Sequence, residues 1–183
     1  MLPIALAAQT NPTFQVPTKK SVDSIRSELK RTNNDTLRIA IWMAIANYNF
    51  HLKVDSAIYY EELALALARK LKLRLWEAYA LELHGASLTN SGAYTKALQI
   101  FLAAQKIAED EESEKNIWNI AAFTKDEKPA TARLNILAAI HSDKIRLYKD
   151  TGNQEEALKS ILECKRIAES NADSTVLSLV YLQ

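Results

Sequence analysis

The chain has 183 residues, of which 48% are hydrophobic and 25% charged, and its 23 Lys and Arg nearly balance its 22 Asp and Glu. This length is typical of one domain, and the near-zero net charge gives no sequence-wide field that would attract nucleic acid or an anionic membrane. The single cysteine excludes an internal disulfide framework and a thiolate metal cluster, while three glycines and four prolines favour long helices over a turn-rich β-sandwich.

Residues 1–18 precede the first amphipathic segment, and two interpretations of them stay open. MLPIALAAQT is a short apolar run that ends in small residues, like the last part of a secretory signal, although no Lys or Arg precedes Lys19. A signal-peptide remnant predicts a periplasmic or other extracytoplasmic location. The alternative is a disordered lead, in which three prolines prevent a regular helix and a cytoplasmic location stays open. Because the sequence has no 18-residue apolar stretch, we expect no membrane span.

A single repeat domain is predicted over 19–183, beginning with a short amphipathic cap helix at 21–31. After it, three segments can each be anchored on an alanine that is followed by small residues at positions seven and eleven and by a large aliphatic residue at position ten. These offsets fall on one face of a 3.6-residue helix, so each buried stripe allows close helix approach. The equivalent residues are Ala57, Ala64, Leu67 and Ala68, then Ala97, Ala104, Ile107 and Ala108, then Ala157, Cys164, Ile167 and Ala168.

Another helical segment lies upstream of each anchor, which predicts helical hairpins at about 35–71, 74–110 and 130–171. Gly92 and Gly152 suit the left-handed position that ends a helix and begins a tight turn. The second and third anchors are 60 residues apart instead of 40, which indicates an insert at about 111–130 before Pro129 restarts a helix. The apolar segment 173–183 is predicted to be half of a further hairpin, and hence the chain to be a fragment of a longer protein.

The second unit resembles the tetratricopeptide (TPR) repeat. Its matching residues are Leu81, Gly85, Leu88, Gly92-Ala93-Tyr94, Ala97, Phe101 and Ala104. The resemblance implies an all-α fold, a right-handed α-α superhelix of antiparallel helix hairpins. Units of 40 residues are similar to the TPR arrays in the sensor regions of bacterial signalling proteins such as histidine kinases.

The resemblance implies a non-catalytic module that binds a protein or peptide. We expect it to be the extracytoplasmic sensory or input region of a larger bacterial signalling protein, and the alternative is a free-standing scaffold or adaptor for protein assembly. No nucleic acid is expected as a direct partner. A homodimer through the exposed C-terminal helix is a further expectation.

The concave side of such an array is lined by the first helix of each unit. Carried over from the TPR pattern, the candidate groove residues are Trp42, Asn49, Phe50, Tyr79, Glu82, Asn90, Arg146 and Lys149. A bound peptide would use the aromatic residues as anchors, and the asparagines would hydrogen-bond its backbone. Trp118 and Phe123 of the insert are either packed on the next hairpin in a short helix or form a lid or docking element.

No catalytic, metal or cofactor-binding constellation is found, so an enzyme is not expected. The three histidines share no helix face at metal-ligand spacing, and His84 and His141 are interpreted as packed residues with one backbone partner each. Cys164 is interpreted as a small buried residue, because alanine occupies its position in the other units. The acidic run 109–114 is interpreted as a solvated loop that helps to end a helix.

Overall fold

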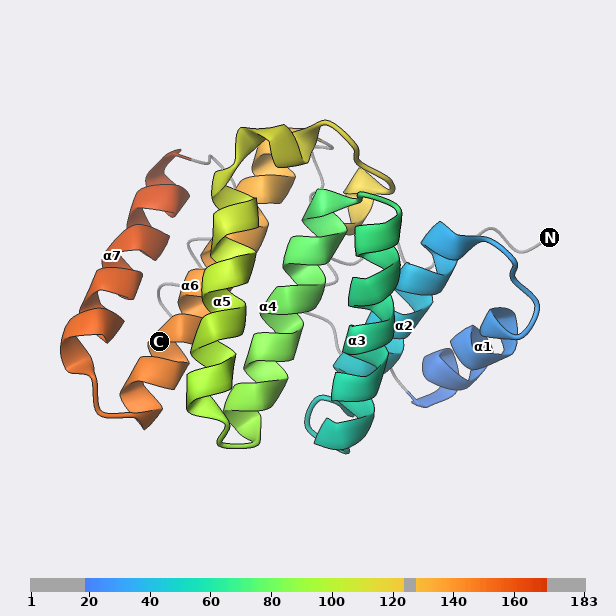
Figure 1. Cartoon of the computed structure of the whole chain (residues 1–183), viewed down its shortest axis with the longest axis horizontal. Coiled ribbons are helices and arrows are strands. Elements are labelled where there is room, and N and C mark those ends of the chain that lie inside the picture. Colours follow the sequence, from blue (N-terminus) through green and yellow to red (C-terminus); the bar gives the residue numbers. More distant parts are fainter. Residues whose placement is uncertain (1–18, 124–127, 171–183) are drawn as a thin grey trace.

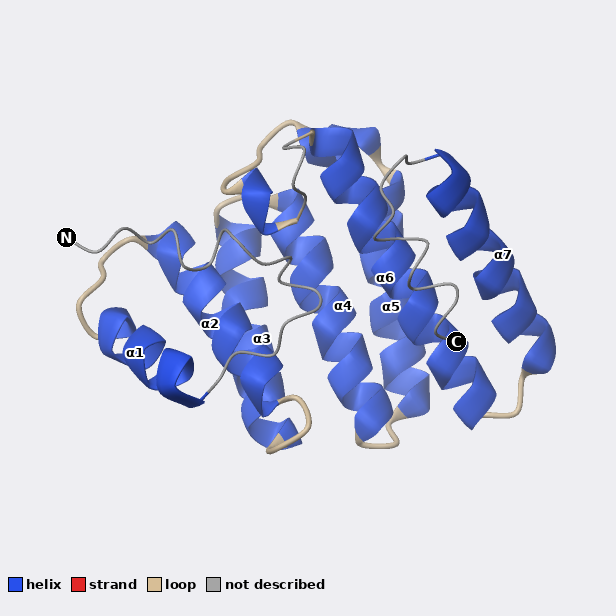
Figure 2. Ribbon diagram, turned by 180° about the vertical axis from the view of Figure 1, so that it is seen from behind, coloured by secondary structure: helices blue, strands red, loops and turns tan. Residues whose placement is uncertain are grey.

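The computed structural model describes residues 19–123 and 128–170. Across these residues the chain forms helices and no strand, which confirms the all-α class (Figure 2). The α-helices of this part are α1 (Lys19–Leu29), α2 (Asp35–Asn49), α3 (Val54–Lys70), α4 (Arg74–Asn90), α5 (Tyr94–Glu109), α6 (Pro129–Asp150) and α7 (Gln154–Ser170). Two short 3-10 helices, η2 (Glu111–Glu114) and η3 (Ile120–Ala122), lie between α5 and α6.

Helices that follow one another in the chain pack together and form two layers. One layer consists of α2, α4 and α6, in which α4 contacts both of the others. On its other side, α3 contacts α2 and α4, α5 contacts α4 and α6, and α7 contacts α6. Figures 1 and 2 show the two layers from opposite sides, with α1 at one end against α2. The pairs α2–α3, α4–α5 and α6–α7 lie where the sequence places the three hairpins.

The anchor alanines of the repeat are buried in the helix packing. The anchors Ala57, Ala97 and Ala157 each expose at most 2% of their surface. A Cβ atom on Gly85 would lie 2.6 Å from Cε1 of Phe101, so α4 and α5 approach closely where the glycine meets the ring. Cys164 is buried, and burial raises the pKa of its thiol to about 12, which makes it an inert small core residue as expected.

Three helix ends use the same left-handed turn. Gly92 and Gly152 have φ of 78° and 73°, as predicted, and Lys72 between α3 and α4 has φ of 56°. In each turn the next N–H donates to a carbonyl five residues back, as Leu73 does to Ala68 at 3.0 Å. The sequence gives no glycine signal at Lys72, so this turn was not anticipated.

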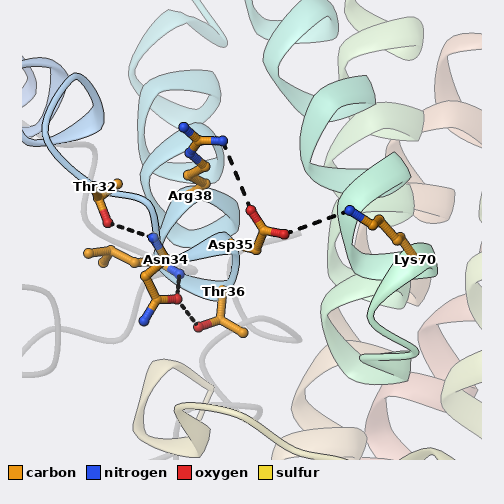
Figure 3. A network of polar contacts seen from close by, with 7 residues as sticks. Thr32, Asn34, Asp35, Thr36, Arg38 and Lys70 are labelled. Carbon is orange, nitrogen blue, oxygen red and sulfur yellow. Dashed lines mark hydrogen bonds and ion pairs between the residues drawn. The ribbon is translucent and has the colours of Figure 1, made fainter.

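A polar network holds the start of α2 (Figure 3). Asn34 is its N-cap, and its Oδ1 accepts from Leu37 N at 3.1 Å and from the Thr36 hydroxyl at 2.6 Å. Asp35 follows in the first turn, within 3.9 Å of Lys70 Nζ at the end of α3. Because these ion-paired side chains are largely exposed, the network fixes the geometry of the hairpin end more than it adds stability.

Helix α1 lies where the cap helix is expected and has its own small core. Val22 is fully buried with Ile41 and Ile45 of α2. This cluster is separate from the main core, which runs from α2 to α7. α1 therefore covers an apolar side of α2 that points away from the rest of the described helices.

The insert packs back onto the helices on either side of it. Arg133 of α6 is buried, lies 2.6 Å from Glu114 of η2 and donates to Ala108 O at the end of α5 at 3.1 Å. The interpretation of the acidic run as a solvated loop is therefore wrong for Glu114. That carboxylate is needed to neutralise a buried guanidinium, although the rest of the run is exposed apart from the buried Ser113.

Two sequence predictions lie outside the described residues. These are the signal-peptide remnant or disordered lead at 1–18 and the further half-hairpin at 173–183, through which a homodimer was expected.

Candidate functional site

A polar cluster on the α2–α4–α6 layer brings together residues from all three units. Arg146 of α6 lies at its centre, with Nη2 3.4 Å from Oδ1 of Asp143 and 3.4 Å from the carbonyl oxygen of Ala86 on α4. Its guanidinium carbon is 5.7 Å from the centre of the Phe50 ring at the end of α2. Glu82 lies one turn before Ala86 on α4 and is hydrogen-bonded to Asp143.

The electrostatics of this cluster are governed by burial. Glu82 exposes 6% of its surface, and burial raises the pKa of its carboxyl well above the usual value, with further contributions from Asp143 and Glu61. Burial also raises the pKa of Asp143, while the hydrogen bond from Glu82 and the charge of Arg146 lower it. The pKa of Glu82 is raised further than that of Asp143, so we assign the shared proton to the Glu82 carboxyl, which donates a hydrogen bond to Asp143. With Arg146 the cluster then carries no net charge.

Within residues 19–123 and 128–170, two buried atoms of the cluster have no hydrogen-bond partner. They are Oε2 of Glu82, an acceptor, and Nε of Arg146, a donor. A buried polar group without a partner costs about 1–3 kcal/mol. The two atoms belong to adjacent helices of one layer and have opposite hydrogen-bonding character.

The structure brings three of the predicted groove residues together in this cluster, namely Phe50, Glu82 and Arg146. Trp42 is half-buried and packs on the main core, and Asn90 and Lys149 are exposed at the ends of α4 and α6. Asp143, which completes the cluster, was not a candidate site residue. The signal that could have found it is its position three residues before Arg146, on the same face of α6.

Besides Glu82, two more of the predicted groove residues are buried. Asn49 exposes 4% of its surface, and its side-chain nitrogen donates to Ile45 O at 2.8 Å, so the expectation that it would hydrogen-bond a peptide is wrong. Tyr79 also exposes 4%, and it packs edge-on against Phe123 with ring centres 5.6 Å apart. Both side chains point into helix packing, because α2 and α4 are covered on more than one side.

The aromatic residues of the insert contact α4. Trp76 Nε1 donates to the carbonyl oxygen of Trp118 at 2.8 Å, and the two indole rings are 5.6 Å apart. Phe123 exposes 3% and lies against Trp76 and Tyr79, so it offers no docking surface. The insert thus packs on the preceding hairpin, and reaches the next one where Asn135 of α6 donates to Phe123 O at 3.0 Å.

A second buried polar group lies between α3 and α4. Oε1 of Glu61 accepts from the Ser87 hydroxyl at 2.6 Å, and its Oε2 lies 3.2 Å from Nδ1 of His84. The backbone partner predicted for His84 is therefore wrong, since a carboxyl faces the ring instead. His141, the other packed histidine, has no partner at Nδ1 among the residues that the structure describes.

Serine, histidine and glutamate side chains together raise the question of nucleophilic catalysis. In a catalytic triad the imidazole stands between the hydroxyl and the carboxylate. Here both the hydroxyl and the imidazole contact the carboxyl, and all three residues are buried. The arrangement is that of a buried structural hydrogen-bond group.

Comparison with known proteins does not identify the chain. No family model, curated protein or solved structure matches it. In the described part, the helices include none with the length and apolar character to cross a membrane, and the side chains include no group of three or more that could hold a metal ion.

Proposed function

We propose that this chain is a non-catalytic, TPR-like repeat module that binds a protein or peptide segment along the α2–α4–α6 layer. The proposal includes the superhelical arrangement of hairpins that the repeat resemblance implies. It is supported by the regular alternation of two helix layers and by the buried alanines that recur in all three units.

The observation that carries the proposal is the convergence of Phe50, Glu82 and Arg146 from three successive units. A segment that contacted this cluster would touch side chains from all three units. The cluster combines an aromatic ring, a guanidinium and a buried carboxyl, and Arg and aromatic side chains contribute strongly to binding at protein interfaces. The outward side of α7, by contrast, carries exposed ion pairs that contribute little, such as Arg166 with Glu163.

The test is a selection from a random dodecapeptide display library on the folded protein, followed by fluorescence anisotropy with the selected peptides. We expect Arg146→Ala to weaken binding at least about tenfold, equivalent to about 1.4 kcal/mol. Arg166→Ala is the matched control, because it removes an arginine from the exposed side of α7 and should leave affinity unchanged. Selected peptides that bind the two variants equally well would contradict the proposal.

Within this function, we propose that the module is the extracytoplasmic input region of a larger bacterial signalling protein. The apolar start of the sequence and the 40-residue spacing of the units support this assignment. The full-length reading frame tests it. A basic region before Leu2, with a membrane span and an output domain after Gln183, is the expected result, whereas a stop codon after Gln183 would favour the scaffold.

A further inference from the structure

The turn between α3 and α4 carries four basic side chains within six residues. They are Arg69, Lys70, Lys72 and Arg74, and all four are exposed. At the equivalent end of α5 the chain is acidic instead, and the run 109–112 is exposed there. The repeat spacing therefore does not require a positive charge at this place in a unit.

Two of these side chains are held together by one buried carboxylate of α4. Oε1 of Glu77 lies 3.0 Å from Nε of Arg69, and Oε2 lies 2.7 Å from Nη1 of Arg74. Glu77 exposes 7% of its surface, whereas the side chains of Arg69 and Arg74 expose 54% and 44%. The carboxylate therefore fixes the two guanidiniums beside each other at the surface, where both are open to solvent.

Each guanidinium has hydrogen-bonding capacity left over. A guanidinium carries N–H groups on three nitrogens, and in the contact with Glu77 each arginine uses a single nitrogen. Within residues 19–123 and 128–170, neither Arg69 nor Arg74 makes another side-chain hydrogen bond. The planar N–H edges that remain match the oxygens of a further carboxylate.

The turn also has an excess of positive charge. In the described part of the chain, Glu77 and Asp35 are the carboxylates that form ion pairs with its four basic residues, so two positive charges remain. Lys72 has no ion pair there, and it holds the left-handed conformation that glycine holds in the equivalent turns. A lysine at this position has a conformational cost, which indicates that its side chain contributes something that glycine would not.

The surroundings of the turn favour a short acidic segment over an extended polyanion. Asn116 donates to the carbonyl oxygens of Leu71 and Lys72 at 3.3 and 3.1 Å, which places the insert beside the turn. Glu111 and Glu112 of η2 expose 87% and 68% of their side chains at the same end of the molecule (Figure 1). A nucleic acid or an anionic membrane would extend over these carboxylates and be repelled, whereas a peptide can keep its acidic residues on the turn.

We propose that residues 69–74 form a docking surface for an acidic segment of a protein partner, whose carboxylates are bound by Arg69, Arg74 and Lys72. Because Glu77 already orients the two arginines, binding does not have to order them first. The inference goes beyond the proposed function, since Arg74 precedes Glu82 by eight residues and the two surfaces are about 12 Å apart along α4.

The experiment titrates fluorescein-labelled hexaglutamate with the full chain in about 20 mM NaCl and follows fluorescence anisotropy. Saturable binding is expected, and labelled hexaglutamine, which is neutral, should not bind. Labelled hexathymidylate and phosphatidylserine vesicles present phosphates of nucleic acid and lipid instead of peptide carboxylates. Both should bind more weakly than hexaglutamate, because the acidic run lies beside the turn.

The variants separate this surface from the overall charge of the chain. The double variant Arg69→Gln with Arg74→Gln keeps a donor for each oxygen of Glu77 and should weaken binding at least about tenfold. Lys72→Gly should weaken binding about threefold while making the fold more stable, so its loss of affinity cannot come from unfolding. The matched controls are Lys106→Gln on α5 and Arg166→Gln on α7, which are exposed and should leave affinity nearly unchanged.

Three results would overturn the inference. One is a loss of affinity in the controls as large as that in the variants of the turn, which would show a general effect of net charge. Another is tighter binding of hexathymidylate or of the vesicles than of hexaglutamate, which would assign the turn to phosphate-bearing partners. The third is no binding of hexaglutamate to the wild type at millimolar concentrations. None of these results bears on peptides that bind in an Arg146→Ala-sensitive manner, so the proposed function is tested separately.

Discussion

Helices α3 and α5 carry different residues at the same repeat position. Four residues after the anchor alanine stands Glu61 in α3 and Phe101 in α5, and both are fully buried. Phe101 fills the space above Gly85, whereas the Glu61 carboxyl meets Ser87 and His84. The repeat position thus determines that the side chain is buried, and the residues of the neighbouring helix determine whether an apolar or a polar side chain fits there.

The two buried side chains, Phe101 and Glu61, contribute differently to the free energy of folding. Burying a phenylalanine side chain stabilises the fold by about 1.5–3 kcal/mol. Burying a carboxyl costs free energy that its hydrogen bonds must offset, and the cost is larger when the group is charged. The first unit should therefore be more sensitive to pH and the second more sensitive to side-chain volume.

The largest effect is expected from Phe101→Ala. Removing the ring leaves a cavity between α4 and α5, and the free energy of unfolding in urea should fall by about 3–5 kcal/mol. Gly85→Ala, which forces a methyl group into the same ring, should cost about 1–3 kcal/mol. The control is Leu102→Ala on the exposed side of α5. A loss below about 1 kcal/mol for Phe101→Ala would show that the α4–α5 contact is not close-packed.

The next effect concerns His141, which occupies the repeat position of Ile41 and Leu81, sixteen residues before the anchor. Burial, and then the charge of Lys144, lower the pKa of His141 to about 4 from its usual 6.5. Because the unfolded chain takes up the proton more readily, stability should fall as the pH falls from 6.5 to 4, by up to about 3 kcal/mol.

The measurement is urea unfolding across this range for the wild type and His141→Leu. The variant lacks the titrating group and should become progressively more stable than the wild type as the pH falls. Gln99→Leu, an exposed substitution on α5, should keep the wild-type pH dependence. A constant difference between wild type and His141→Leu at all pH values would contradict the buried neutral histidine.

A smaller effect with the opposite pH dependence is expected at Glu61. Burial, the largest cause, raises the pKa of this carboxyl above 4.5, so its contribution to stability is present below pH 4.5 and is lost as the pH rises through the raised pKa. Glu61→Gln should therefore gain stability relative to the wild type as the pH rises above 4.5. Ser87→Ala, which leaves Oε1 without its donor, should cost about 1–3 kcal/mol.

Glu62→Gln, an exposed neighbour on the same helix, serves as the control for the loss of one carboxylate. Thermal melts between pH 4 and pH 8 suffice for the comparison. A difference in melting temperature between Glu61→Gln and the wild type that stays constant with pH would show that Glu61 does not titrate as a buried group. The proposed difference in pH sensitivity between α3 and α5 would then be wrong.

The smallest effect concerns the turns. Lys72 holds a left-handed conformation that glycine holds in the equivalent turns at Gly92 and Gly152. Lys72→Gly should raise the free energy of unfolding by about 0.5–1 kcal/mol, and Gly92→Ala should lower it by about 1 kcal/mol. Chemical denaturation of the two variants checks both signs. A destabilised Lys72→Gly would show that the lysine side chain contributes more than its backbone conformation costs.

The repeat spacing predicted helix positions well, because one buried stripe must recur every 3.6 residues in every unit. It predicted the glycine turns and the restart at Pro129 for equally local reasons. It failed for Asn49 and Tyr79, which it placed in a groove. Their burial depends on how neighbouring helices cover α2 and α4, and the sequence of one helix does not contain that information.

The candidate site also could not be predicted from the sequence of single helices. Glu82 and Arg146 could be proposed separately from their repeat positions, but 64 residues separate them in the chain. The contact of Glu82 with Asp143 arises only when α4 packs against α6. The contact of Arg146 with Phe50 arises only when the end of α2 comes close to α6. Likewise, Glu61 and Ser87 carry no local signal of a hydrogen bond, since glutamate and serine are usually solvent-exposed on helices.

By itself the sequence determined the all-α class, the helical segments and the small residues at their contacts, because these follow from local periodicity and steric size. Only the tertiary structure decided which polar residues are buried and what they face. That choice depends on pairs of groups brought together from different helices, where loss of water makes each hydrogen bond or charge decisive. Examples in the described part of the chain are Glu61 with Ser87 and Glu82 with Asp143, and the second pair belongs to the candidate binding site on the α2–α4–α6 layer.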